Sequence, residues 1–130
     1  MRAQAGFARG LELFNQREFF TCHEVWEEIW RPSRQPERLF LQGLIHFAVA
    51  FYHEQQKNPE GAKRQLSKGL RKLAGYLPRF AGIETRPLYE AGIERLVGAE
   101  RGTDPGDFPR IQESAKKLGL KMGRSETGPT

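Results

Sequence analysis

The residues best suited to chemistry are His23 and Glu27, which lie in a stretch that also carries both tryptophans and the single cysteine. Side chains four positions apart in an α-helix stack on the same face, so this imidazole and this carboxylate can meet. A histidine with an orienting carboxylate is a typical general base, and the same two side chains can bind a divalent metal ion. The sequence therefore predicts a candidate catalytic or metal site at His23 and Glu27.

Further polar and aromatic residues are candidates for ligand binding around this pair. Glu24 and Phe20 lie beside it on the same predicted helix. Gln42, His46 and His53 project within an arc of about 40° on the next long helix, given the helical period. Two such helices packed together could supply three or four ligands from inside a bundle. We therefore expect a polar seam between the second and third helices.

Several interpretations of this seam stay open. The segment H-E-V-W-E lacks the second histidine of the zinc-protease motif, and the paired Glu-x-x-His motifs of di-iron bundles are absent. No nucleophile completes a triad, so whether the protein is an enzyme stays open, and the metal and any cofactor are unknown. The competing interpretation is structural: His23 would hydrogen-bond Glu27 or a side chain of the next helix, because buried polar groups need partners.

Apolar spacing predicts five helices, over about residues 3–15, 19–31, 37–57, 59–77 and 85–99. Pro32 ends the second, and Asn58 with Pro59 begins the fourth as cap and first helical residue. No alternating pattern indicates a strand. The expected fold is all-α, a compact bundle of about five helices built from helical hairpins. Residues 1–102 would form this domain, and 103–130 a basic, largely disordered tail with a short helix near 111–118.

The motif N-x-x-x-F-F-x-x-H-E-V-W-E-E-I-W spans Asn15 to Trp30 and is followed by LFLQGLIHFAVAFYH and NPEGAKRQL. Together these segments resemble the domain of unknown function family 309. The resemblance covers roughly Leu11 to Val97. It implies a compact helical bundle found in bacteria and archaea, and it implies no established activity.

The net charge is +5, and the whole excess of positive charge falls in residues 58–130. Four of these cations share one face of the predicted fourth helix: Arg64, Lys68, Arg71 and Lys72. Clustered Lys and Arg can neutralise phosphates, but no zinc-finger or RNA-binding signature accompanies them. A solvated face is the competing interpretation. A protein-interaction module, with a peptide in the groove between hairpins as in tetratricopeptide proteins, is a further alternative.

Length and composition limit the class of protein. A chain of 130 residues fits one domain. No apolar run reaches the roughly 18 residues that cross a bilayer, and the first residues lack the apolar core of a secretory signal. The sequence thus predicts no membrane partner. Cys22 alone makes no internal disulfide, so we expect a buried, reduced thiol in a cytoplasmic protein.

Overall fold

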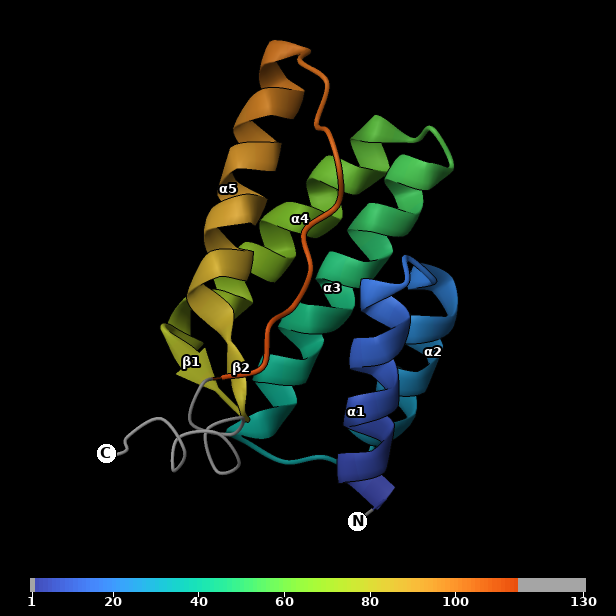
Figure 1. Cartoon of the computed structure of the whole chain (residues 1–130), viewed down its shortest axis with the longest axis vertical. Helices are drawn as coiled ribbons and strands as arrows, with labels where there is room; N and C mark the ends of the chain where they lie inside the picture. Colours follow the sequence, from blue (N-terminus) through green and yellow to red (C-terminus); the bar gives the residue numbers. More distant parts are fainter. Residues whose placement is uncertain (1, 115–130) are drawn as a thin grey trace, which may run out of the picture.

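The computed structural model describes residues 2–114 and places five α-helices around one core (Figure 1). This confirms the all-α bundle that the sequence predicts. Two short strands and one turn of 3-10 helix complete the fold. The helices are α1 (Arg2–Asn15), α2 (Phe19–Trp30), α3 (Glu37–Gln55), α4 (Pro59–Leu73) and α5 (Thr85–Arg101). None of the helices in the described part of the chain is long and apolar enough to cross a membrane.

Helix boundaries follow the local chemistry. The Asn58 side chain accepts a hydrogen bond of 3.2 Å from the Gly61 amide, and Pro59 follows as the first residue of α4. Helix α4 ends at Leu73 rather than at the predicted residue 77, because the chain tightens into a 3-10 turn over Ala74–Tyr76. That turn is fixed by hydrogen bonds of Tyr76, whose hydroxyl donates to the Pro36 carbonyl and whose backbone carbonyl accepts from the Thr85 hydroxyl.

Helices α1 and α2 pack closely because small residues of α1 face the large ones of α2. A Cβ at Gly10 would collide with the Trp26 ring, so only glycine fits there. The Trp26 indole donates a hydrogen bond of 3.3 Å to the Phe7 carbonyl, and the Cys22 thiol donates to the Gly10 carbonyl. The burial expected for Cys22 is confirmed, since its side chain is fully buried and unpaired with another cysteine.

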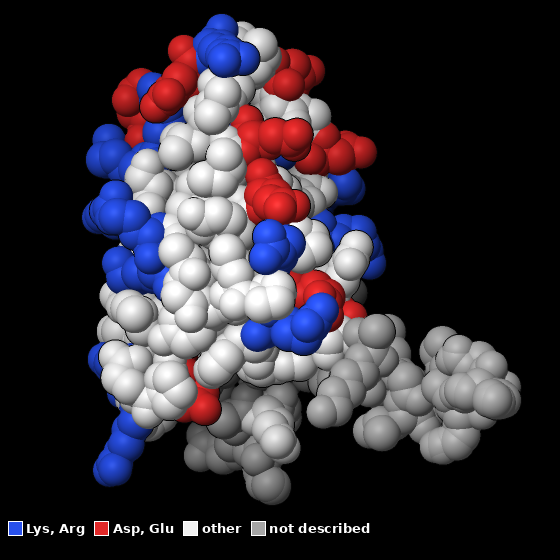
Figure 2. All heavy atoms as spheres, turned by 90° about the vertical axis from the view of Figure 1, so that its left-hand side faces the viewer, with Lys and Arg blue, Asp and Glu red and all other residues white. Residues whose placement is uncertain are grey.

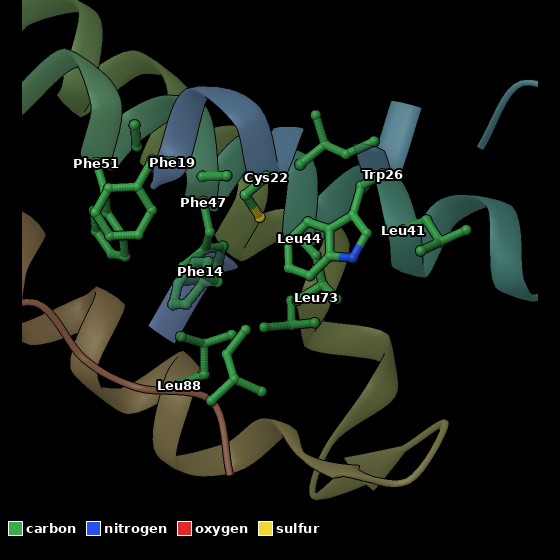
Figure 3. Packing of buried hydrophobic residues seen from close by; sticks show 14 of the residues in the cluster. Phe14, Phe19, Cys22, Trp26, Leu41, Leu44, Phe47, Phe51, Leu73 and Leu88 are labelled. Atoms are coloured by element: carbon green, nitrogen blue, oxygen red, sulfur yellow. The ribbon is translucent and has the colours of Figure 1, made fainter. Parts of the chain in front are cut away.

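Helix α3 lies at the centre and contributes the largest share of the core. Figure 3 shows Leu44, Phe47 and Phe51 of α3 pointing into a cluster with side chains of the neighbouring helices. Helix α4 approaches the other side of α3 closely, since a Cβ added at Gly69 would lie 2.8 Å from the Phe47 ring. Helix α3 is therefore packed on both sides, against α2 on one and against α4 on the other.

A small β-hairpin between α4 and α5 departs from the prediction that the chain has no strand. Strand β1 (Arg79–Phe80) pairs antiparallel with β2 (Ile83–Glu84). The turn uses left-handed backbone at Ala81 and Gly82. Two-residue strands are too short to give an alternating pattern, which is why the sequence shows no sign of them.

The sequence assigns residues 103–114 to the tail, but the structure packs them along the bundle (Figure 1). The Phe108 ring packs edge-to-face against the Phe19 ring, with 5.0 Å between the ring centroids, and Ile111 is buried. Ile83 forms an antiparallel bridge with Glu113, so this end of the segment is extended, not helical. The rest of the predicted tail and short helix, residues 115–130, lies outside the described residues, where the predicted domain boundary stays a prediction.

Arg95 fixes this segment onto the helices. Its side chain is only 6% exposed and forms an ion pair of 3.0 Å with Glu54 of α3. The guanidinium also donates to the carbonyl oxygens of residues 105, 106 and 107, and it lies 4.6 Å from the Phe108 ring centroid. One buried cation thus connects α3, α5 and the segment that follows α5.

Candidate functional site

The catalytic pair predicted on α2 lies on the outer surface of that helix. The His23 ring nitrogen Nδ1 is 2.7 Å from the Phe20 carbonyl of its own helix. Glu27 forms an ion pair of 3.7 Å with Arg31. Within the part of the chain that the structure describes, no hydrogen bond or ion pair joins His23 to Glu27. The structure therefore gives His23 a local backbone contact rather than an orienting carboxylate.

Two ligand-binding candidates on α2 are exposed. Glu24 is exposed, and the Phe20 side chain is 47% exposed with its ring 5.0 Å from His23 and 5.2 Å from Tyr52 of α3. Tyr52 is the α3 residue that reaches this edge of α2. Phe20, His23 and Tyr52 thus form a small aromatic contact at the surface.

The polar residues of α3 face a different neighbour. His46 Nδ1 lies 2.7 Å from Gln65 Oε1 of α4, and His53 lies 3.2 Å from the Asn58 amide at the start of α4. Gln42 is half-buried on the same arc of α3. The two halves of the predicted seam are not brought together, because α3 turns this arc toward α4 and turns Tyr52 toward α2.

The potential metal ligands among the described residues are not grouped into a metal centre. Across residues 2–114, no group of three or more His, Cys, Asp or Glu side chains is placed to hold a metal ion. Burial raises the pKa of the Cys22 thiol far above its ordinary value, which disfavours the thiolate that a metal or a substrate would need. The structure thus gives no support to a ligand set centred on α2.

His46 is held neutral at the junction of α3 and α4. Burial lowers its pKa from the ordinary 6.5; the hydrogen bond to Gln65 acts in the opposite direction, and the nearby charges of Lys72, Lys68 and Arg71 lower it further. Since Gln65 Oε1 accepts, the Nδ1 atom carries the proton. The Nε2 atom is then a buried acceptor, and it has no hydrogen-bond partner among the described residues.

This environment predicts a pH dependence of stability. The folded pKa of His46 lies below that of the unfolded chain. As the pH falls through about 6.5, His46 becomes protonated in the unfolded chain but stays neutral in the folded chain. The free energy of unfolding should then decline by at most about 1.4 kcal/mol per pH unit for this one group. Urea denaturation from about pH 8 to pH 5 should show a smaller decline in His46→Gln. An identical decline in both proteins would contradict this assignment.

The four cations that the sequence places on one face of α4 form a continuous surface beside His46. We call Arg64, Lys68, Arg71 and Lys72 the α4 basic surface. None of the four lies within ion-pair distance of a carboxylate in the described part of the chain, whereas Lys63 of the same helix pairs with Glu60 at 3.3 Å. Three of them are exposed and Lys72 is half-buried. Positive charge accumulates here without a local counter-charge.

The side of the molecule that carries α5 has an uneven distribution of charge. Figure 2 shows this side, where Lys and Arg predominate along the left edge and lie among Asp and Glu along the right edge. A band without charge runs between the two edges, and Ile93 and Val97 of α5 are each 40% exposed. On this face the basic side chains therefore predominate along one edge and are mixed with acidic side chains along the other.

Comparison with known sequences finds a match to a family model. Residues 7–65 match the family model described as Domain of unknown function (DUF309). The match covers a little less than half of the chain. It confirms the resemblance carried by the Asn15–Trp30 motif. The matched residues comprise most of α1, all of α2 and α3, and the first part of α4.

Two bacterial proteins also match parts of the chain. The chain is 38% identical over 63 residues to the uncharacterised protein YpuF of Bacillus subtilis (strain 168), covering 47% of this chain and 36% of that protein. It is 26% identical over 96 residues to an uncharacterised protein of Aquifex aeolicus (strain VF5), covering 73% of this chain and 28% of that protein. The chain thus matches about a third of the length of these relatives. Both are named as uncharacterised, so they assign no activity.

The DUF309 match includes His23, His46 and Gln65 and ends before Lys68. Sequence reasoning missed Gln65 as the partner of His46. A signal was present: Gly43 and Gly69 allow α3 and α4 to approach closely, and His46 and Gln65 lie on the margin of that contact. It also missed Arg95, which shares one buried face of α5 with Leu88 and Gly92.

Proposed function

We propose that this domain is a binding module that takes the phosphate backbone of a nucleic acid on the α4 basic surface. One observation carries the proposal: four neighbouring cations have no carboxylate partner in residues 2–114, although ion pairs form at several other places on the surface. Unpaired cations keep a layer of counter-ions, and a polyanion that replaces this layer gains entropy as ions are released.

The dimensions of the surface suit a polyanion better than a single small anion. Arg64 and Lys72 are eight positions apart, so the surface extends about 12 Å along the helix axis. Double-stranded DNA carries about one charge per 1.7 Å of its own axis, so several phosphates fit along this length. Gln65 lies on the same helix between these cations and the His46 ring. The proposed contact recognises the backbone and carries no base specificity.

A reaction at His23 and Glu27 stays a prediction with less support. A general base needs a free ring nitrogen and a partner that orients the imidazole. The Phe20 carbonyl contacts Nδ1 of His23 and, among the described residues, leaves Nε2 free, but Glu27 pairs with Arg31 and so supplies no carboxylate to orient the imidazole. A groove between the hairpins is likewise a weaker candidate for peptide binding, because residues 103–108 lie against the α3–α5 junction through Arg95.

We also propose a cytoplasmic setting for this module. The lone Cys22 is a buried free thiol with a raised pKa, which is compatible with a reducing compartment and needs no disulfide partner. Nucleic acid is available in the same compartment.

Charge reversal on α4 tests the proposed function. Binding of fluorescently labelled duplex DNA and RNA would be measured by anisotropy over a series of salt concentrations. The triple variant Arg64→Glu, Lys68→Glu, Arg71→Glu should bind far more weakly. Its slope of log K against log salt should become shallower by about 0.9 for each phosphate that the variant no longer neutralises, or roughly 3 for all three positions.

A matched control carries the same change of net charge on other faces of the molecule. Arg9, Arg86 and Arg101 are exposed cations of α1 and α5, and the triple variant with glutamate at these positions should retain most of the affinity and the salt slope. Equal losses of affinity in the two variants would show that only net charge matters. That result, or no binding by the unmodified chain at low salt, would overturn the proposal.

A further inference from the structure

A largely apolar cavity of about 520 Å³ lies at the opposite end of α3 from the Arg95 junction. It is formed where α1, the end of α2 and the start of α3 meet the turn of the β-hairpin. Its rim carries one charge of each sign, from Arg34 and Glu37. The apolar lining comprises Phe7, Ile29, Phe40, Leu41 and Ala81.

The last described residues deliver the chain to the edge of this cavity. The Glu84 amide donates to the Gln112 carbonyl at 2.8 Å, and the Ser114 amide donates to the Gly82 carbonyl at 2.8 Å. In this antiparallel register each step along the chain moves one residue back along the hairpin, from Glu84 toward Ala81. Ser114 is itself 5% exposed. The chain is therefore held firmly one residue away from a wall of the cavity.

The sequence that follows Ser114 has the chemistry to fill an apolar cavity. Residues 115–122 read AKKLGLKM, in which Leu118, Leu120 and Met122 are separated by small or cationic residues. Four extended residues span at most about 14 Å, so Leu118 can reach the cavity from Ser114. Removing these aliphatic side chains and the cavity wall from water together is favourable, and the lysines can remain in solvent while their neighbours are buried.

We propose that the segment around Leu118–Met122 of this same chain docks into the cavity lined by Phe7, Ile29 and Leu41. The tether makes the contact intramolecular, so the local concentration of the segment at the cavity is high. This docking does not rest on the proposed nucleic-acid contact, because it uses different residues and apolar chemistry.

A spin label tests this docking in the full chain. Cys22 is fully buried, so a label attached to Met122→Cys is directed to one position. We expect the amide signals of Ile29, Leu41 and Ala81 to fall to a small fraction of their intensity while the label is paramagnetic and to recover on its reduction. Adding Leu118→Glu and Leu120→Glu should restore these signals without reduction, since glutamate would not enter the apolar cavity.

Two results would overturn the proposal. The signals of Ile29 and Leu41 could be unaffected by the label, or equally affected with both leucines replaced. A mixture of isotope-labelled unmodified chain with spin-labelled unenriched chain provides the third arm. Signal loss in this mixture would show that the segment of a second copy occupies the cavity, and would also contradict docking within one chain.

Discussion

Replacing Arg95 by leucine is expected to destabilise the protein by about 3–5 kcal/mol, the cost of breaking a buried ion pair by removing one partner. Glu54 would be left at 18% side-chain exposure without its cation, and the carbonyl oxygens of residues 105–107 would be left without their donors. Urea denaturation would measure the loss of stability. Hydrogen exchange should show that the amides of Ile111 and Ser114, which donate to Asn15 and to Gly82, lose their protection first.

Two companion variants separate charge from geometry at this position. Arg95→Lys keeps the charge but lacks the planar guanidinium that donates to both Glu54 and the backbone carbonyls. It should therefore retain only part of the stability that Arg95→Leu loses. The double variant Arg95→Leu, Glu54→Leu should be more stable than Arg95→Leu alone, because no unpaired charge stays buried. A denaturation midpoint for Arg95→Leu equal to that of the unmodified protein would contradict the role given to this residue.

Trp26→Ala should cost about 3–5 kcal/mol of unfolding free energy, the range for removing a large aromatic side chain from a core. Trp26 is fully buried, stacks between Phe7 and Phe14 and donates to a backbone carbonyl of α1. Trp30→Ala should cost clearly less, because Trp30 is only half-buried and is covered on one face by the Arg38 guanidinium, 4.0 Å from its ring. Chemical denaturation of both variants would measure the difference.

Equal destabilisation by the two tryptophan variants would show that the outer face of α2 is packed as tightly as its inner face. The sequence could not distinguish them, since Trp26 and Trp30 lie four positions apart on one apolar stripe. The difference in burial between the two tryptophans depends on how α1 packs against α2. Gly10 of α1 lies directly against the Trp26 ring.

Local sequence chemistry accounts for most of the helix limits. Asn58 and Pro59 specify the start of α4, and the observed cap bond to Gly61 is the expected one. The predicted end of α4 is too late, because tertiary hydrogen bonds of Tyr76 tighten the chain there. Such bonds join residues that are distant in sequence, and one chain carries no periodic signal for them.

The sequence predicts which residues of the candidate site share a helix face, but it does not predict which helix each face packs against. Periodicity places His46 on one arc of α3, and it predicts the single-sign surface of α4. It cannot give the packing of helices, which decides that His46 meets Gln65 rather than His23. The contact of residues 103–114 with the bundle was missed for a similar reason. The segment TDPGDFPR has the composition of a solvent-exposed loop, and its contact with the bundle depends on the tertiary contact between Phe108 and Arg95.

Binding of nucleic acid by the α4 basic surface is tested most directly by a magnetic-resonance titration of the full chain with a short DNA duplex at low salt. Binding through the α4 basic surface predicts amide shifts at Arg64, Lys68, Arg71 and Lys72 and a shift of the His46 ring, all reversed by added salt. Residues of α1 should not move. Shifts centred on α2 around His23, or no shifts anywhere, would contradict the assignment of this surface as the site where the protein binds nucleic acid.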